Sequence, residues 1–140
     1  MELVLDSSVA LAWVLPDETS SRADRFLAQT SRESVFWVPA LWWYEVANAL
    51  TVARRRQRLT EADLVRAIEL YRALPVRTDA APDAHAPWRL QVIADEHGLS
   101  AYDAAYVELA QRRGLRFATF DRRLGSAARR ASVMLVALGG

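Results

Sequence analysis

The sequence contains no cysteine and no lysine, since all 18 of its basic residues are arginine, and it has only five glycines. Without cysteine there is no thiolate nucleophile, cysteine-bound zinc or iron–sulfur cluster. Without lysine there is no P-loop or Schiff-base lysine, and none of the kind used by receiver or haloacid-dehalogenase phosphoryl sites. The glycines form neither a GxGxxG nor a GxSxG pattern. An enzyme of this composition has to rely on carboxylates, and we expect them to act with a bound metal ion.

Long apolar runs are also missing, although 52% of the 140 residues are hydrophobic. The longest runs cover residues 9–15 and 35–44, which is too short for a membrane span of about 18 residues or more. The first residues show neither the basic segment nor the apolar stretch of a signal peptide. We therefore expect a cytoplasmic protein that makes no membrane contact, folded as one domain over residues 1–140.

Positive charge is concentrated toward the end of the chain, although the formal net charge is only +1. Residues 109–140 hold seven arginines and a single acid, Asp121. Attraction to phosphate is one explanation, and a solvated helical face is the other. Charge alone favours the second.

Short β-branched and aromatic runs alternate with segments of helical periodicity. We expect strands at residues 3–5, 35–38, 75–78, 115–119 and 133–136. We expect helices at residues 8–15, 17–30, 40–56, 60–73, 87–97, 100–113 and 122–130, with a loop at residues 80–87. This order predicts an α/β sandwich in which helices flank a mostly parallel central sheet. Ligands of such folds bind at the carboxyl ends of the strands, so the residues after each strand are the ones to inspect.

Four carboxylates fall at or near the starts of expected helices. Asp6 and Asp121 each end a strand and begin a helix, so they should share one edge of a parallel sheet. Asp103 lies in the first turn of its helix, and Glu45 lies near the start of a mostly apolar helix. Singly, each has an ordinary explanation: capping for the aspartates, and solvent exposure or an arginine partner for Glu45. Together they would repel one another, and a bound divalent cation would offset that repulsion.

The helix that contains Glu45 carries two further features. Trp42 and Trp43 are adjacent, so both cannot face the same side of a helix, and we expect one of them to be exposed at a partner surface. Arginines 54, 55, 56 and 58 end the same helix. Cations suit that end of a helix dipole, so the arginines form either a solvated helix end or a contact to RNA or a partner.

Four segments carry a resemblance to a known family. In chain order they are DSSVALAW from residue 6 with Asp17 and Glu18, EVANAL from residue 45, LSAYDAAYVELA from residue 99, and ATFD from residue 118 with Leu124. In these segments the sequence resembles the PIN-domain proteins, and within them the VapC-type toxins of bacterial and archaeal toxin–antitoxin pairs. The motifs occur in the family's order and cover the chain end to end.

The resemblance implies a PIN-like fold and an endoribonuclease that depends on Mg²⁺ or Mn²⁺. The acidic catalytic set that it implies is Asp6, Glu45, Asp103 and Asp121, of which the metal ligands are Asp6, Asp103 and Asp121. Polar support is expected from Ser7 or Ser8, Asn48 and Thr119. Contacts to the RNA backbone are expected from Arg54, Arg55, Arg58, Arg122 and Arg123. The family also implies a homodimer and a small antitoxin protein that covers the site.

Two other functions compete with this interpretation. The first is a PIN-like module that binds RNA or a partner without cutting, but a binder of phosphate gains nothing from clustered negative charge. The second is a phosphotransfer domain with an acceptor aspartate, which the missing lysine and the lack of an acidic pair at Asp6 disfavour.

Overall fold

A sheet of parallel strands forms the centre of the computed structural model, which describes residues 1–80 and 83–139. The strands lie in the order β3-β2-β1-β4 and all their pairings are parallel. Their bounds are β1 Glu2–Leu5, β2 Val35–Val38, β3 Val76–Thr78 and β4 Arg116–Ala118. The central strand β1 is apolar because both of its faces are covered, and Leu3, Val4 and Leu5 are fully buried. The predicted α/β class is confirmed.

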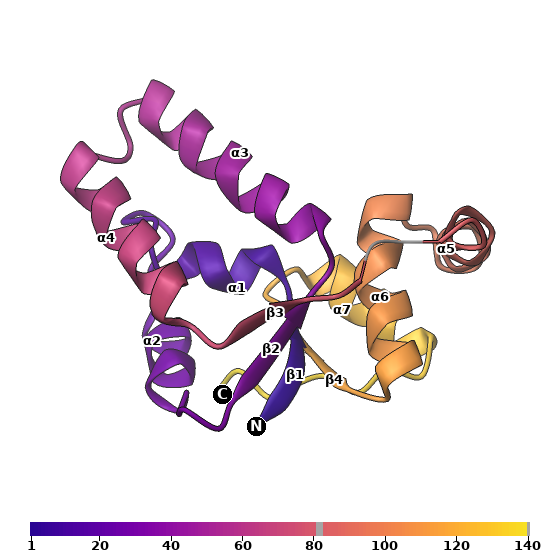
Figure 1. The fold of residues 1–140 in the computed structure, drawn as a ribbon. Coiled ribbons are helices and arrows are strands. Elements are labelled where there is room, and N and C mark those ends of the chain that lie inside the picture. Colours follow the sequence, from indigo (N-terminus) through magenta and orange to yellow (C-terminus); the bar gives the residue numbers. More distant parts are fainter. Residues whose placement is uncertain (81–82, 140) are drawn as a thin grey trace.

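Helices cover the sheet on both sides, with α1 to α4 on one side and α5 to α7 on the other (Figure 1). Their bounds are α1 Ser7–Ala12, α2 Ser21–Ala28, α3 Leu41–Arg55, α4 Glu61–Ala73, α5 Ala86–His97, α6 Ala101–Arg113 and α7 Arg122–Arg130. Across the described part of the chain, no helix is long and apolar enough to cross a bilayer.

The expected strand at residues 133–136 does not form. This segment runs beside β4 and makes one parallel bridge, between Phe117 and Leu135. The amide of Phe117 donates to the carbonyl of Met134, and the amide of Val136 donates to the carbonyl of Phe117, both at 2.9 Å. The segment therefore adds a single bridge to the outer edge of β4 and does not continue as a strand.

Two expected helices on the α1 to α4 side are shorter than the sequence pattern predicted. The helix at residues 8–15 is Ser7–Ala12, and the helix at residues 17–30 is Ser21–Ala28. The second begins late because Ser20 is its N-cap and accepts a hydrogen bond from the amide of Ala23 at 3.1 Å. Of the expected loop at residues 80–87, positions 81–82 lie outside the described residues, and α5 already begins at Ala86.

The apolar side of α3 packs toward the core and separates the two adjacent tryptophans. Trp42 is fully buried, whereas Trp43 is 42% exposed. The indole nitrogen of Trp43 donates to the hydroxyl of Thr78 at the end of β3, at 2.8 Å. The predicted split between the two tryptophans is confirmed, and the partner at the exposed one stays a prediction.

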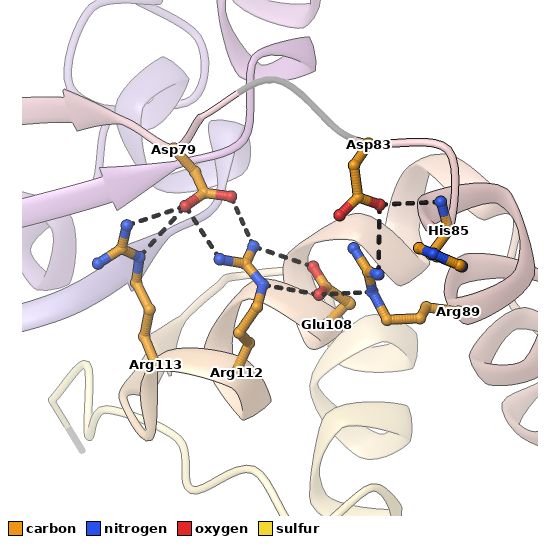
Figure 2. Close-up of polar contacts among 7 residues, drawn as sticks. All are labelled: Asp79, Asp83, His85, Arg89, Glu108, Arg112 and Arg113. Carbon is orange, nitrogen blue, oxygen red and sulfur yellow. Dashed lines mark hydrogen bonds and ion pairs between the residues drawn. The ribbon is translucent and has the colours of Figure 1, made fainter.

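A network of arginines and carboxylates fastens α6 to the end of β3 (Figure 2). Asp79, which directly follows β3, accepts hydrogen bonds from Arg112 and Arg113 at 2.5 and 3.0 Å. Arg112 also donates to Glu108 at 2.8 Å, and Glu108 pairs with Arg89 of α5 at 3.4 Å. Burial works to raise the pKa of Asp79, but the two guanidinium groups outweigh it and lower that pKa. The carboxylate that follows β3 is therefore neutralised within the fold.

Candidate active site

Asp6 lies at the carboxyl end of the central strand β1, and its side chain is almost fully buried. Its backbone amide donates to the carbonyl of Ala118 at the end of β4, at 2.9 Å. This bond places Asp6 beside the segment that leads to Asp121. Asp6 occupies the N-cap position of α1, but its side chain makes no capping hydrogen bond. Capping therefore does not explain why a carboxylate occupies this position.

Two hydroxyl groups orient the Asp6 carboxylate. Ser8 and Thr119 both donate to its Oδ2 atom, at 2.6 and 2.7 Å. Each hydroxyl also accepts a backbone amide at 3.0 Å, Ser8 from Phe120 and Thr119 from Asp121. Because the amides supply those protons, each hydroxyl has its own proton to give to Asp6. Among the described residues no hydrogen bond reaches Oδ1 of Asp6, which leaves that oxygen available as a ligand.

The protonation of Asp6 reflects its surroundings. Burial is the largest effect and raises its pKa, the hydrogen bonds from Ser8 and Thr119 lower it, and the charges of Asp121 and Asp103 raise it. The net shift is upward. Because two neighbouring carboxylates help to raise its pKa, Asp6 lies in a negative electrostatic field. Such a field attracts a cation.

Asp103 and Asp63 occupy the same position in similar helix-start patterns, but the structure uses them differently. In α4, Asp63 completes a capping box: its amide donates to Thr60 at 3.1 Å, and its carboxylate accepts the Thr60 amide at 3.0 Å. In α6, the amide of Asp103 donates to Ser100 at 3.1 Å. Across the described residues no return bond runs from the Ser100 amide to the Asp103 carboxylate. That carboxylate is not used for capping. It is available to the group Asp6, Glu45, Asp103 and Asp121, which we call the acidic cluster.

Asp103 lies close enough to Asp6 and Asp121 for their charges to interact. Burial and the charge of Asp121 raise the pKa of Asp103, and the nearby Arg123 lowers it, with a net upward shift. Asp121 has a second role, because its Oδ1 atom caps α7 by accepting the amide of Leu124 at 3.0 Å. Its capping and its membership of the cluster are therefore compatible.

Glu45 reaches the cluster from α3 and is held there by a tyrosine of α6. The hydroxyl of Tyr106 donates to Oε1 of Glu45, and Tyr106 itself is fully buried beside Phe117, with ring centroids 5.7 Å apart. Burial raises the pKa of Glu45, the Tyr106 hydrogen bond lowers it, and the charge of Asp6 raises it further; the net shift is upward. The sequence assigned no role to Tyr106, although its spacing of three residues from Asp103 places both on one helix face.

The four carboxylates have no cationic partner within ion-pair distance among the described residues. Among the ion pairs of the described residues, which include those of Asp79 and Glu108, none involves a member of the set Asp6, Glu45, Asp103 and Asp121. Among the described residues no ion pair therefore relieves the repulsion within the cluster, although the charge of Arg123 lowers the pKa of Asp103.

The donor chemistry of the cluster suits a hard divalent cation. Every donor is an oxygen, the type that Mg²⁺ and Mn²⁺ prefer. Across the described residues no three acidic or histidine side chains are gathered tightly enough to enclose a cation by themselves. Mg²⁺ is usually bound by one or two carboxylates, with waters and substrate phosphate oxygens completing the shell, so an open arrangement fits it.

The other expected site residues are divided between the cluster and the rest of the surface. Thr119 lies in the cluster, and Ser7 is buried beside Glu45 and lowers its pKa. The hydroxyl that contacts Asp6 belongs to Ser8. Asn48 is exposed on α3, and the structure shows no hydrogen bond from its side chain to a described residue of the cluster.

The arginines expected to contact RNA also lie in two places. Arg122 and Arg123 begin α7 next to Asp121. The others lie at the far end of α3 from Glu45 (Figure 1). There Arg58 pairs with Asp17 at 2.6 Å, and Arg54 donates to the carbonyl of Leu59 at 3.1 Å. The RNA contact of Arg54, Arg55 and Arg58 stays a prediction, and two of these side chains already have structural partners.

Asp103→Asn and Asp63→Asn are expected to change stability with opposite pH dependence. The pKa of Asp103 is raised above its ordinary value of 3.8, so its contribution to the free energy of unfolding falls as pH rises through the folded pKa. The pKa of Asp63 is lowered from 3.8, so its contribution is lost as pH falls through the folded pKa. From about pH 3 to pH 7, the first variant should gain stability relative to the wild type and the second should lose it. Urea unfolding in metal-free buffer checks this, and the same sign in both variants would contradict it.

The fold and the site together define a class of protein. It is a parallel α/β protein with a group of unpaired carboxylates at the carboxyl edge of its sheet. Residues 3–130 match the PIN domain. The chain belongs to the PIN-domain family.

Similar proteins agree with this assignment. The chain is 35% identical over 130 residues to ribonuclease VapC3 of Pyrobaculum aerophilum, a match that covers 89% of this chain and 92% of that protein. It is 34% identical over 123 residues to ribonuclease VapC9 of Mycobacterium tuberculosis, covering 87% of each. Its fold is also similar to the crystal structure of VapBC2 from Rickettsia felis bound to a promoter DNA fragment, with a TM-score of 0.67, 9% identity and coverage of 97% and 98% of the two chains.

Proposed function

We propose that this protein is an Mg²⁺- or Mn²⁺-dependent endoribonuclease that acts as the toxin of a toxin–antitoxin pair. One observation carries the enzymatic part: four carboxylates, from the end of β1, from α3, from α6 and from the β4–α7 connection, are close enough for their charges to interact, and none is in an ion pair with an arginine among the described residues. The identity of 35% with a VapC ribonuclease over most of the chain supports RNA as the substrate. The repulsion stored in the cluster is useful only if a cation binds there.

The residues of the cluster divide the chemistry among them. Asp6, through its free Oδ1 atom, would hold the metal together with Asp103 and Asp121, while Ser8 and Thr119 keep the Asp6 carboxylate in place. A bound Mg²⁺ or Mn²⁺ supplies polarisation of the scissile phosphate and a lower pKa for a bound water. Glu45 is suited to accept a proton, because burial raises its pKa and the Tyr106 hydroxyl holds its side chain by donating to Oε1.

The products follow from an in-line attack by water. The water oxygen forms a bond to phosphorus as its proton passes to Glu45, and the bond from phosphorus to the 3′ oxygen breaks. The 3′ oxygen leaves and takes up a proton from solvent, so the products carry a 5′-phosphate and a 3′-hydroxyl. The 2′-hydroxyl is not required as a nucleophile, in keeping with a chain that has only two histidines.

The antitoxin and the second copy of the chain belong to the same proposal. Exposed aromatic side chains adjoin the cluster in the sequence, because Tyr44 precedes Glu45 and Tyr102 precedes Asp103, and these tyrosines are 77% and 72% exposed. Aromatic residues are enriched where proteins meet. An antitoxin that covers the acidic site would bury both of them.

Cleavage of pooled cellular RNA by the purified protein tests the proposed function. The protein is incubated with RNA in Mn²⁺ or in EDTA, after confirmation that no antitoxin has co-purified. We expect cleavage in Mn²⁺ only, with 5′-phosphate ends on the fragments. Folded, metal-bound protein that leaves the RNA intact but still binds it would favour the non-catalytic binding module.

Tyr106→Phe is expected to reduce cleavage by about 10- to 100-fold, the usual cost of losing a group that orients an active-site residue. The Tyr106 hydrogen bond lowers the pKa of Glu45, so its loss should move the acidic limb of the pH–rate profile to higher pH. Cleavage rates measured across pH check both effects.

Tyr71→Phe is the matched control for this variant. The hydroxyl of Tyr71 is also buried and donates to the carbonyl of Ala10 at 3.0 Å, away from the cluster. Both variants should lose about 1 kcal/mol of stability in urea unfolding, but only Tyr106→Phe should shift the pH–rate profile. An equal shift in both would show that Tyr106 acts through stability alone.

A further inference from the structure

Helix α7 presents an exposed face made almost entirely of arginine. Its buried side consists of Leu124, Gly125, Ala127 and Ala128. Its exposed residues are Arg122, Arg123, Ser126, Arg129 and Arg130. The helix begins directly after Asp121 of the acidic cluster, so the positive face starts where the negative site ends.

The positive charge of this face is not neutralised within the fold. Among the described residues the arginines in ion pairs are Arg58, Arg66, Arg89, Arg112 and Arg113. None of the four arginines of α7 is among them. Arg123 and Arg130 donate to the carbonyls of Gly98 and His97, at 2.9 and 3.3 Å. A carbonyl orients a guanidinium group but leaves its charge intact.

Helix stability does not account for the arrangement. Cations near the end of a helix are favourable, which explains Arg129 and Arg130, but cations in the first turn oppose the helix dipole. Arg122 and Arg123 lie in that first turn. Their position is unfavourable for the stability of the helix, so interactions of the helix itself do not explain it.

Arg123 and Arg130 contact the turn that precedes α6. The carbonyls of His97 and Gly98 belong to the turn from α5 to α6, and α6 carries Asp103. Arg123 is close enough to Asp103 to lower its pKa. From Arg122 to Arg129, and again from Arg123 to Arg130, the helix advances by about 10 Å. Two rows of arginine therefore lead away from the cluster along α7.

We propose that the arginine face of α7 is the track that holds the phosphate backbone of the RNA beside the acidic site. This inference rests on the proposed function and adds Arg129 and Arg130 to the residues that bind the substrate. Four unpaired carboxylates repel phosphate, so a substrate strand needs positive charge next to them. The track recognises a single-stranded polyanion by charge and is indifferent to its bases.

Binding of a fluorescein-labelled single-stranded RNA in EDTA tests the track without requiring cleavage. Affinity is measured by anisotropy over about 50 to 200 mM salt. Arg122→Gln/Arg129→Gln removes two charges whose side chains make no hydrogen bond to the described residues. We expect at least about tenfold weaker binding in low salt and a salt slope shallower by about 1.4, since each phosphate contact to a single strand contributes about 0.7. Arg122→Lys/Arg129→Lys should restore most of the affinity.

Arg32→Gln/Arg116→Gln is the matched control, with the same change in net charge. Both residues are exposed and lie near the amino ends of strands, at the opposite edge of the sheet from the site. We expect binding within about twofold of the wild type. Equal losses in the two double variants would overturn the track in favour of a diffuse charge effect, and no loss in either would overturn it as well. An acidic peptide of the same charge that binds α7 more tightly than RNA would assign the face to a protein partner and overturn the proposal.

The two proposals fail separately. If the wild-type protein cuts RNA and the α7 variant binds RNA as tightly as the wild type does, the ribonuclease proposal stands and the track is contradicted. If the wild-type protein does not cut RNA but its RNA binding depends on Arg122 and Arg129, the track stands and the ribonuclease proposal is contradicted.

Discussion

Asp103→Asn is expected to lower the rate of RNA cleavage at least about a hundredfold, the size of effect seen when one preorganised electrostatic group is removed from an active site. Asparagine keeps the size of the side chain and the backbone bond from residue 103 to Ser100. The lost charge is one that the structure does not use to cap α6. The loss should therefore appear in cleavage while the fold stays intact.

Asp63→Asn provides the control for this prediction. It makes the same chemical change at the equivalent position of α4, where the carboxylate closes a capping box. It should lower stability and leave the cleavage rate per folded molecule unchanged. A folded Asp103→Asn protein that cuts RNA within about threefold of the wild type would contradict the catalytic role of the cluster, since effects of that size are far below those of removing an electrostatic group.

Millimolar Mn²⁺ is expected to raise the melting temperature of the protein, because a cation that binds only the folded cluster stabilises it by mass action. At about a hundredfold excess over the dissociation constant the gain is about 2.7 kcal/mol, which for a chain of this size corresponds to roughly 8 °C. Burial and, to a lesser degree, the neighbouring carboxylates raise the pKa values of Asp6, Glu45 and Asp103, and a bound cation would offset the second effect. Differential scanning fluorimetry with and without EDTA measures the shift.

The Asp6→Asn/Asp103→Asn double variant separates site binding from general ionic effects. It should melt at or above the wild-type temperature in EDTA, since two repelling charges are gone, and should gain little from Mn²⁺. Sodium chloride at matched ionic strength should leave the wild type close to its EDTA value. A wild-type protein that shows no shift in Mn²⁺ would contradict the metal site.

Much of the fold could be predicted from local pattern. The run LVL before Asp6 is apolar on both faces because β1 is the central strand, and a continuous apolar run is the pattern of such a strand. The helix starts at Thr60 and Ser100 were also visible, because capping depends on residues within one turn. The strand expected at residues 133–136 makes only one bridge, because pairing at a sheet edge depends on how the segment meets β4 after folding, which its own residues do not show.

The sequence likewise predicted one part of the candidate site and left another part open. The sequence by itself placed Asp6, Glu45, Asp103 and Asp121 at helix starts and strand ends, and the order of these motifs was enough to indicate the family. Which of Ser7 and Ser8 contacts Asp6 was left open, and Tyr106 was given no role. The tyrosine is 61 residues from Glu45 along the chain, so its contact exists only once α3 and α6 pack together.

The tertiary structure alone decided which charges are neutralised. Asp63 and Asp103 stand in similar local patterns, yet the first is used in capping and the second faces other carboxylates. Asp79 follows a strand just as Asp6 does, yet it is paired with Arg112, 33 residues away along the chain. Local pattern determines where a carboxylate enters the fold, because backbone geometry is set by near neighbours. Its charge state and its freedom to bind a ligand depend on groups brought near by folding, because electrostatic energy is set by distance in space.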